Sequence, residues 1–206
     1  MRSAGITLFL LLAVLGCSTA AEAGYQGPIR FFADAGEAVA SLNDGLDRAI
    51  TTKTRLPGDA KLDVLRRKAS NLDAQLAGAI GHKEYLISSL RLYLANPTTA
   101  RWRMAHAEMN VLSEITGGIM IELKDDQPVL VELAGPSLVS NLVAVMLSRA
   151  SILQELSTLP EPTSDAERSA LKVLVDRYDE LVQQLRRLNV TLDQYAVSFR
   201  SDAEGK

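Results

Sequence analysis

The chain has 206 residues, a formal net charge of −3, and 47% hydrophobic and 23% charged residues. These values are typical of one globular domain with a sizeable core, and they argue against broad nucleic-acid binding, which needs a basic face. The single cysteine, Cys17, excludes an intrachain disulfide framework and a multi-cysteine zinc site.

The first residues have the layout of a secretory signal. Arg2 precedes an apolar run of about ten residues, from Ile6 to Leu15, and small residues follow. The run is too short to span a bilayer, which takes about twenty residues. Val14-Leu15-Gly16-Cys17 resembles the lipobox of bacterial lipoproteins, although Val14 and Leu15 depart from the residues usually found there. The resemblance covers residues 1–17 only.

The resemblance implies cleavage before Cys17 and lipidation of its sulfur and new amine. The organisation would then be a signal peptide over 1–16, a lipidated Cys17 with a flexible tether over 17–28, and a domain over 29–201. In lipoproteins of the enteric type, a residue such as Ser18 after the cysteine goes with sorting to the outer membrane.

Two alternatives stay open for the same segment. A signal peptide cut after Ala23, in the small-x-small site Ala21-Glu22-Ala23, would discard Cys17 and release a soluble periplasmic protein. A cytosolic protein with an apolar N-terminal helix is the other alternative.

The first helix of the domain is expected from about Ile29 to Thr52. Apolar residues recur there at steps of three and four, which places them on one helical face: Phe32, Ala35, Val39, Leu42, Leu46 and Ala49. The turn-like trio Asn43-Asp44-Gly45 could split this helix in two.

A longer helix is expected over 59–95, with Asp59 as its N-cap. Its heptad series has one charged member, Lys83: Leu62, Leu65, Ala69, Leu72, Leu76, Ala79, Lys83, Leu86, Leu90 and Tyr93. Gly78 and Gly81 indicate a close helix approach or a bend.

After the Asn96-Pro97 break, Thr98 or Thr99 can cap a third helix. Trp102 fits either a cap on one end of the bundle or an exposed recognition residue, and the cap is preferred. Four methionines are expected to fill gaps in the core: Met104, Met109, Met120 and Met146. Residues 117–134 fit either a short hairpin or a kinked helix, and the helix is slightly preferred.

Gly135-Pro136 predicts a break before a helix over Ser137–Leu156, which is apolar all round in its first half and is therefore expected at the centre of the bundle. The last helix runs over 164–200 and opens with a capping box, Ser164 and Glu167. Its stripe holds for four heptads: Leu171, Leu174, Tyr178, Leu181, Leu185, Leu188, Leu192, Tyr195 and Phe199.

These elements predict an all-α fold, an antiparallel bundle of four to five helices with two long heptad-patterned helices, 59–95 and 164–200. Because the two long helices have matched lengths, we expect them to lie alongside each other for most of the bundle.

The chain carries no specific catalytic or cofactor motif. It has no Gly-rich phosphate loop and no nucleophile elbow, and neither His82 nor His106 follows a glutamate by three residues, as di-iron bundles require. Lys83 and Arg149 each interrupt an apolar stripe. Both are expected to reach the rim of the bundle, and the alternative is an anionic ligand or an ion pair inside it.

The sequence therefore favours a non-enzymatic protein without metal or cofactor, anchored to the membrane of the bacterial cell envelope through a lipid on Cys17. It would act through helix-mediated contacts, as a scaffold or accessory subunit of an envelope partner, with no nucleic acid and with a homodimer left open. The alternative is a periplasmic ligand-binding or sensor-type bundle with a polar cavity near Lys83 or Arg149.

Overall fold

The computed structural model describes residues 4–52, 59–111, 127, 131, 135–147 and 155–204, and it places side chains in most of 24–51, 67–111, 135–145 and 155–194. The described chain is all-α, as predicted, without a strand. Its labelled helices are α1 (Ala4–Thr52), α2 (Asp59–Ala95), α5 (Pro136–Leu147) and α7 (Asp165–Glu204). A further helix covers 99–111.

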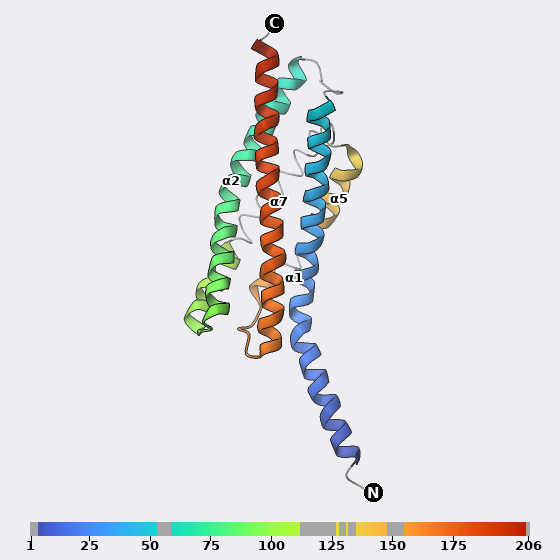
Figure 1. Cartoon of the computed structure of the whole chain (residues 1–206), viewed down its shortest axis with the longest axis vertical. Coiled ribbons are helices and arrows are strands. Elements are labelled where there is room, and N and C mark those ends of the chain that lie inside the picture. Colours follow the sequence, from blue (N-terminus) through green and yellow to red (C-terminus); the bar gives the residue numbers. More distant parts are fainter. Residues whose placement is uncertain are drawn as a thin grey trace.

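Helix α7 lies between α1 and α2 and packs against both (Figure 1). The predicted stripe accounts for this position, because it is buried at every heptad position whose side chain is described except the half-buried Leu185: Leu171, Leu174, Tyr178, Leu181, Leu188 and Leu192. Val175 and Val182 widen the stripe and are also buried, so that α7 can contact a helix on either side.

The directions of the helices differ from the prediction in one respect. Helix α2 runs antiparallel to α7, but α1 runs parallel to it (Figure 1). Phe32 on α1 contacts Tyr178 on α7, and further along both helices Asp47 on α1 accepts a hydrogen bond from Thr191 on α7. Later residues of α1 thus contact later residues of α7, as in a parallel pair. The antiparallel rule follows from short loops between consecutive helices. It does not constrain α1 and α7, since most of the chain lies between them.

Helix α1 is longer than predicted at its N-terminal end. It begins at Ala4 and not near Ile29, and it contains Pro28, so the structure places helix where an irregular tether was expected. Tyr25 is only 1% exposed and belongs to the core, so the packed domain begins at least three residues before the predicted boundary at residue 28. The N-terminal part of α1 projects past the ends of α2 and α7 (Figure 1).

Asn43-Asp44-Gly45 does not split α1. Asn43 is 0% exposed, and its Nδ2 donates to the backbone oxygen of Gln184 on α7 at 3.0 Å. Asparagine favours turns because its amide competes for nearby backbone groups, but here the amide bonds to the neighbouring helix instead.

The bounds of α2 match the prediction, but no described helix approaches closely at its glycines. A Cβ added at Gly78 or Gly81 would meet no atom of the described residues within 4 Å. The close approach occurs at Gly36 on α1, where a Cβ would lie 3.9 Å from the Cα of Leu181 on α7. Alanine at position 36 would make an ordinary van der Waals contact with Leu181, whereas a side chain larger than alanine would push these two helices apart.

The helix over 99–111 begins as predicted. The amide of Arg101 donates to Oγ1 of Thr98, at 3.4 Å, and Trp102 is buried against the ring of Tyr93, with 5.3 Å between centroids. Trp102 therefore closes one end of the bundle. Met104 does not fill the core as expected, because it is 58% exposed, whereas Met109 is buried.

Helix α5 follows the predicted break, where Gly135 adopts a φ of +92°, a conformation that favours glycine. It packs mainly against α1 and not at the centre, which α7 occupies. Its expected extension over 148–154 falls outside the described residues. The choice between hairpin and helix over 117–134 also lies mostly outside them, although Gln127 and Val131 are both helical.

Candidate functional site

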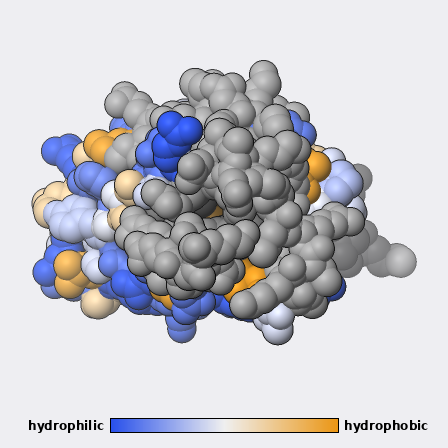
Figure 2. Space-filling model, turned by 90° about the horizontal axis from the view of Figure 1, so that it is seen from above, coloured by the Kyte–Doolittle hydropathy of each residue, from blue (hydrophilic) through white to orange (hydrophobic). Residues whose placement is uncertain are grey.

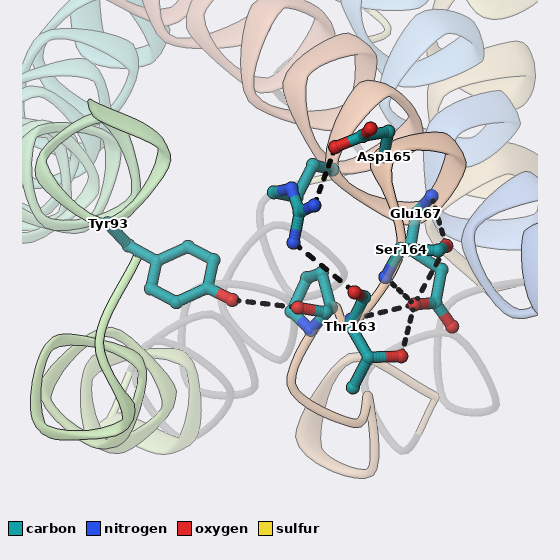
Figure 3. A network of polar contacts seen from close by, with 7 residues as sticks. Tyr93, Thr163, Ser164, Asp165 and Glu167 are labelled. Carbon is teal, nitrogen blue, oxygen red and sulfur yellow. Dashed lines mark hydrogen bonds and ion pairs between the residues drawn. The ribbon is translucent and has the colours of Figure 1, made fainter. Parts of the chain in front are cut away.

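The loop over 158–164 closes one end of the bundle and is fastened by two buried tyrosines. The hydroxyl of Tyr93, on α2, donates to the carbonyl oxygen of Pro162 at 3.1 Å (Figure 3). The hydroxyl of Tyr25, on α1, donates to the carbonyl oxygen of Pro160 at 3.4 Å. The segment that leads into α7 is thus tied to both of the helices that flank α7.

Both phenols are poor acids in this site. Burial raises the pKa of Tyr25, and the nearby Glu167 carboxylate and Tyr93 raise it further. Burial also raises the pKa of Tyr93, and the effect of Glu161 adds to it, whereas Arg168 partly opposes it. The two hydroxyls are therefore neutral donors at neutral pH, which suits hydrogen bonds to carbonyl oxygens and does not supply a phenolate base or nucleophile.

The predicted capping box is present at the start of α7 (Figure 3). The Oγ of Ser164 accepts from the amide of Glu167 at 3.1 Å, and Oε2 of Glu167 accepts from the amide of Ser164 at 2.8 Å. The same oxygen accepts from the amide of Thr163 at 2.7 Å. These hydrogen bonds, from Ser164 first and then from Thr163, lower the pKa of Glu167. The carboxylate therefore works as a structural cap.

A second polar group joins α1 to α7 halfway along the bundle. The guanidinium of Arg187 donates to Asp47 at 2.6 Å and to Asp44 at 2.9 Å. The hydrogen bond with Asp47 is the main cause of the raised pKa of Arg187. Next to it, Asn43 bonds to the Gln184 carbonyl, but its buried Oδ1 accepts no hydrogen bond from the described residues.

The apolar periodicity of α1 gives a signal for the burial of Tyr25 and Asn43, but nearby residues that favour turns predict irregular structure at both positions. Tyr25 stands seven residues before Phe32 and so continues the apolar series of α1 backwards. The neighbouring Gly24, Gly27 and Pro28 favoured an irregular segment instead. Asn43 lies between Leu42 and Leu46, two buried members of the apolar series of α1. Asparagine followed by Asp44 and Gly45 nevertheless predicts a turn.

Two of the three predicted site residues, Cys17 and Lys83, belong to different helices, α1 and α2. Cys17 lies in the projecting part of α1. Lys83 is 5% exposed, so it is buried and does not extend to the rim as we expected, and it takes part in an interaction within the protein. Arg149 lies outside the described residues.

Four of the six exposed large apolar side chains among the described residues lie on two consecutive helices. Tyr85 and Leu92 lie seven residues apart on α2 and are 51% and 60% exposed. Met104 and Val111 have the same spacing on the helix over 99–111 and are 58% and 40% exposed. Residues seven apart share a helical face. Figure 2 shows the bundle from the end at which α7 finishes. The described part of this surface is mainly hydrophilic, with separate hydrophobic spots.

The described residues offer no arrangement for metal chemistry, since no three His, Cys, Asp or Glu side chains among them are grouped to hold an ion. His82 is exposed and His106 is half-buried against Trp102, with 6.1 Å between ring centroids. No described helix has the length and apolar character needed to cross a membrane.

Comparisons with protein-family models, with curated proteins and with solved structures find no match for this chain.

Proposed function

We propose that the protein is a non-enzymatic lipoprotein of the bacterial cell envelope, anchored through Cys17, that acts as a scaffold or accessory subunit through helix-mediated contacts. The observation that carries this proposal is the course of α1. This helix contains Cys17 and continues to Tyr25, which is buried in the core. A lipid on Cys17 would therefore hold the packed bundle itself at the membrane.

Tyr85, Leu92, Met104 and Val111, which we call the outer apolar face, are the surface proposed for partner contacts. The two helices that carry them lie side by side near their connecting turn, where the ring of Tyr93 packs against the ring of Trp102 in a tilted arrangement. Large apolar side chains with arginines at the rim are typical of protein interfaces, and Arg91 and Arg103 are exposed beside this face. The occupant that fits it is an apolar helix of an envelope protein.

The experiment is co-purification from native membranes after chemical cross-linking. Leu92→Ser and Met104→Ser are expected to lose the cross-linked partner without loss of folding, because both side chains are exposed. Val173→Ser and Val190→Ser are matched controls, since these valines are 45% and 54% exposed on α7, outside the outer apolar face. Equal recovery of a partner by all four variants, or no partner for the wild type under several solubilising conditions, would contradict the proposal.

The ligand-binding alternative gains no support from the described residues. It needs a buried cation that is available to an anion, and Lys83 is already engaged within the protein.

A further inference from the structure

We infer that the bundle stands end-on on the lipid bilayer, with the end formed by the 95–101 turn and the 158–164 loop towards the headgroups. This inference rests on the proposed lipid anchor at Cys17 and adds the orientation that the anchor imposes. It names the lipid surface as the partner of this end, which we call the proximal end.

The first step is to establish which end of the bundle α1 enters. Tyr25 bonds to the carbonyl of Pro160, and a Cβ added at Gly24 would lie 3.9 Å from Cδ2 of Leu159. Helix α7 starts at this end, at Asp165, and α2 finishes there, at Ala95 (Figure 1). The parallel course of α1 and α7 therefore puts the N-terminal entry of α1, the start of α7 and the end of α2 together.

The second step is the reach of the connection. Cys17 is eight residues before Tyr25, a span of about 12 Å in a helix and at most about 29 Å fully extended. Helix α7 has 40 residues and is therefore about 60 Å long. Even a fully extended connection holds the proximal end close to the bilayer. The far end could approach the bilayer only if the whole bundle lay down.

The third step is the stiffness of the connection. Residues 17–25 belong to the same helix that packs along α7, and the projecting part of α1 continues outwards from the proximal end (Figure 1). Ala20, Ala21, Glu22 and Ala23 are good helix formers. A helix that continues from the core into the anchor resists the sharp bend that a bundle lying flat would require.

The fourth step is the chemistry of the proximal end. Residues 95–100 carry no charge. The guanidinium of Arg101 donates to the backbone oxygen of Asn96 at 2.9 Å, and Glu161 accepts from Thr99 at 3.4 Å. The carboxylate of Asp165 pairs with Arg168 at 2.5 Å. Asp165 and Arg168 neutralise each other, and Arg101 and Glu161 carry opposite charges, so these four residues give the proximal end no net negative charge that anionic headgroups would repel.

The test uses the full lipidated protein in vesicles of phosphatidylethanolamine and phosphatidylglycerol that contain a nickel-chelating lipid. A nitroxide is attached to Ala100→Cys at the proximal end or, separately, to Asp193→Cys on the far part of α7. Both positions are exposed, and 28 residues of α7 separate Asp193 from Asp165, or about 42 Å. Nickel in the headgroup layer is expected to relax the Ala100→Cys label several-fold more strongly than the Asp193→Cys label.

A variant with ten Gly and Ser residues inserted between Ala23 and Gly24 is expected to reduce this difference, since a flexible linker lets the bundle reorient. A lipidated protein whose two labels relax equally would overturn the orientation and leave the anchor standing. A mature chain without lipid, shown by its intact mass, would overturn the anchor and the orientation together.

Discussion

The two long interfaces of α7 are built differently. Along α1, a buried asparagine bonds to the Gln184 backbone, and Arg187 bridges two aspartates. Along α2, ion pairs at the rim join the two helices, Arg91 with Asp179 and Arg186 with Glu84, beside a stripe that is apolar except for the buried Lys83. A purely apolar stripe tolerates sliding by one heptad, whereas a buried amide has a partner at one register only. The comparison indicates that the Asn43 hydrogen bond specifies the alignment of α1 on α7, whereas the contacts described between α2 and α7 are mainly apolar packing and rim ion pairs.

The largest expected effect is loss of packing between α1 and its neighbours. Leu42 is 0% exposed, so Leu42→Ala removes buried methyl groups and leaves a cavity, and the free energy of unfolding should fall by about 3 kcal/mol. Leu92→Ala, at a position that is 60% exposed, should change it by less than about 0.5 kcal/mol. Urea denaturation measures both, and similar losses would contradict the described core.

The hydrogen bonds from Tyr25 on α1 and Tyr93 on α2 to the 158–164 loop allow the two helices to be compared at the proximal end. Tyr93→Phe leaves the Pro162 carbonyl without its donor in a buried site and should cost about 1.5 kcal/mol. Tyr25→Phe should cost less, because its bond to Pro160 is longer. Thermal unfolding of both variants ranks them, and the reverse order would contradict this view of the loop.

The same tyrosines give the protein a sensitivity to alkaline pH. Their pKa values are raised in the folded state, so the folded protein holds protons that the unfolded chain releases above pH of about 10. The contribution of the two tyrosines to the free energy of unfolding should be fully present below that pH and should decline as the pH rises further. In the Tyr25→Phe, Tyr93→Phe double variant the decline between pH 9 and pH 11, measured by urea denaturation, should be shallower. An unchanged slope would show that other groups are responsible.

The capping box should have a smaller effect. Ser164→Ala removes the acceptor for the Glu167 amide and is expected to cost about 1 kcal/mol. The lowered pKa of Glu167 means that its contribution is present above the unfolded pKa and is lost as the pH falls through the lower folded value. Unfolding of Glu167→Gln between pH 5 and pH 2.5 should therefore depend less on pH than unfolding of the wild type.

The rim ion pairs of α2 should matter least for stability. Arg91 and Asp179 have side chains that are 53% and 31% exposed, and pairs of this kind contribute about 0.5 kcal/mol. Arg91→Ala should lower the midpoint of urea unfolding slightly at low salt and hardly at all at 1 M salt, where such pairs are screened. A loss that persists at high salt would indicate a packing role for the arginine stem.

The substitution Asn43→Leu is expected to change the alignment of α1 on α7 without a large change in the free energy of unfolding. The substitution removes both the bond to Gln184 and the buried unpaired Oδ1, so the free energy of unfolding should change by less than about 1 kcal/mol. The alignment of α1 on α7 should nevertheless loosen. Distances between nitroxides at Glu37→Cys and Glu180→Cys, two exposed positions on α1 and α7, should become more broadly distributed than in the protein with Asn43. An unchanged distribution would mean that packing alone sets the register.

Much of this fold follows from apolar periodicity. The stripe of α7, the bounds of α2, the capping box and the buried position of Trp102 could all be predicted, because each depends on residues close in sequence. The parallel course of α1 and α7 could not be predicted, because it depends on how the chain between them folds. The sequence places Tyr25 in the tether and not in the core for a similar reason. Its burial depends on contacts such as the one with Pro160, which is 135 residues away.

The site was less predictable than the fold. Met104 lies on a helix whose buried face includes Ala105 and Met109, and methionine alone does not tell a gap filler from an exposed contact residue. Lys83 was recognised as an interruption of an apolar stripe, but its burial depends on a side-chain interaction that periodicity does not reveal.

The most direct test of the proposed anchor is the intact mass of the protein isolated from its native membranes, beside a Cys17→Ser form. We predict a mature chain that begins at Cys17 and carries acyl groups, with the acyl mass absent from the serine form. An unlipidated chain that begins at Gly24 would contradict the account and identify the protein as a soluble secreted bundle.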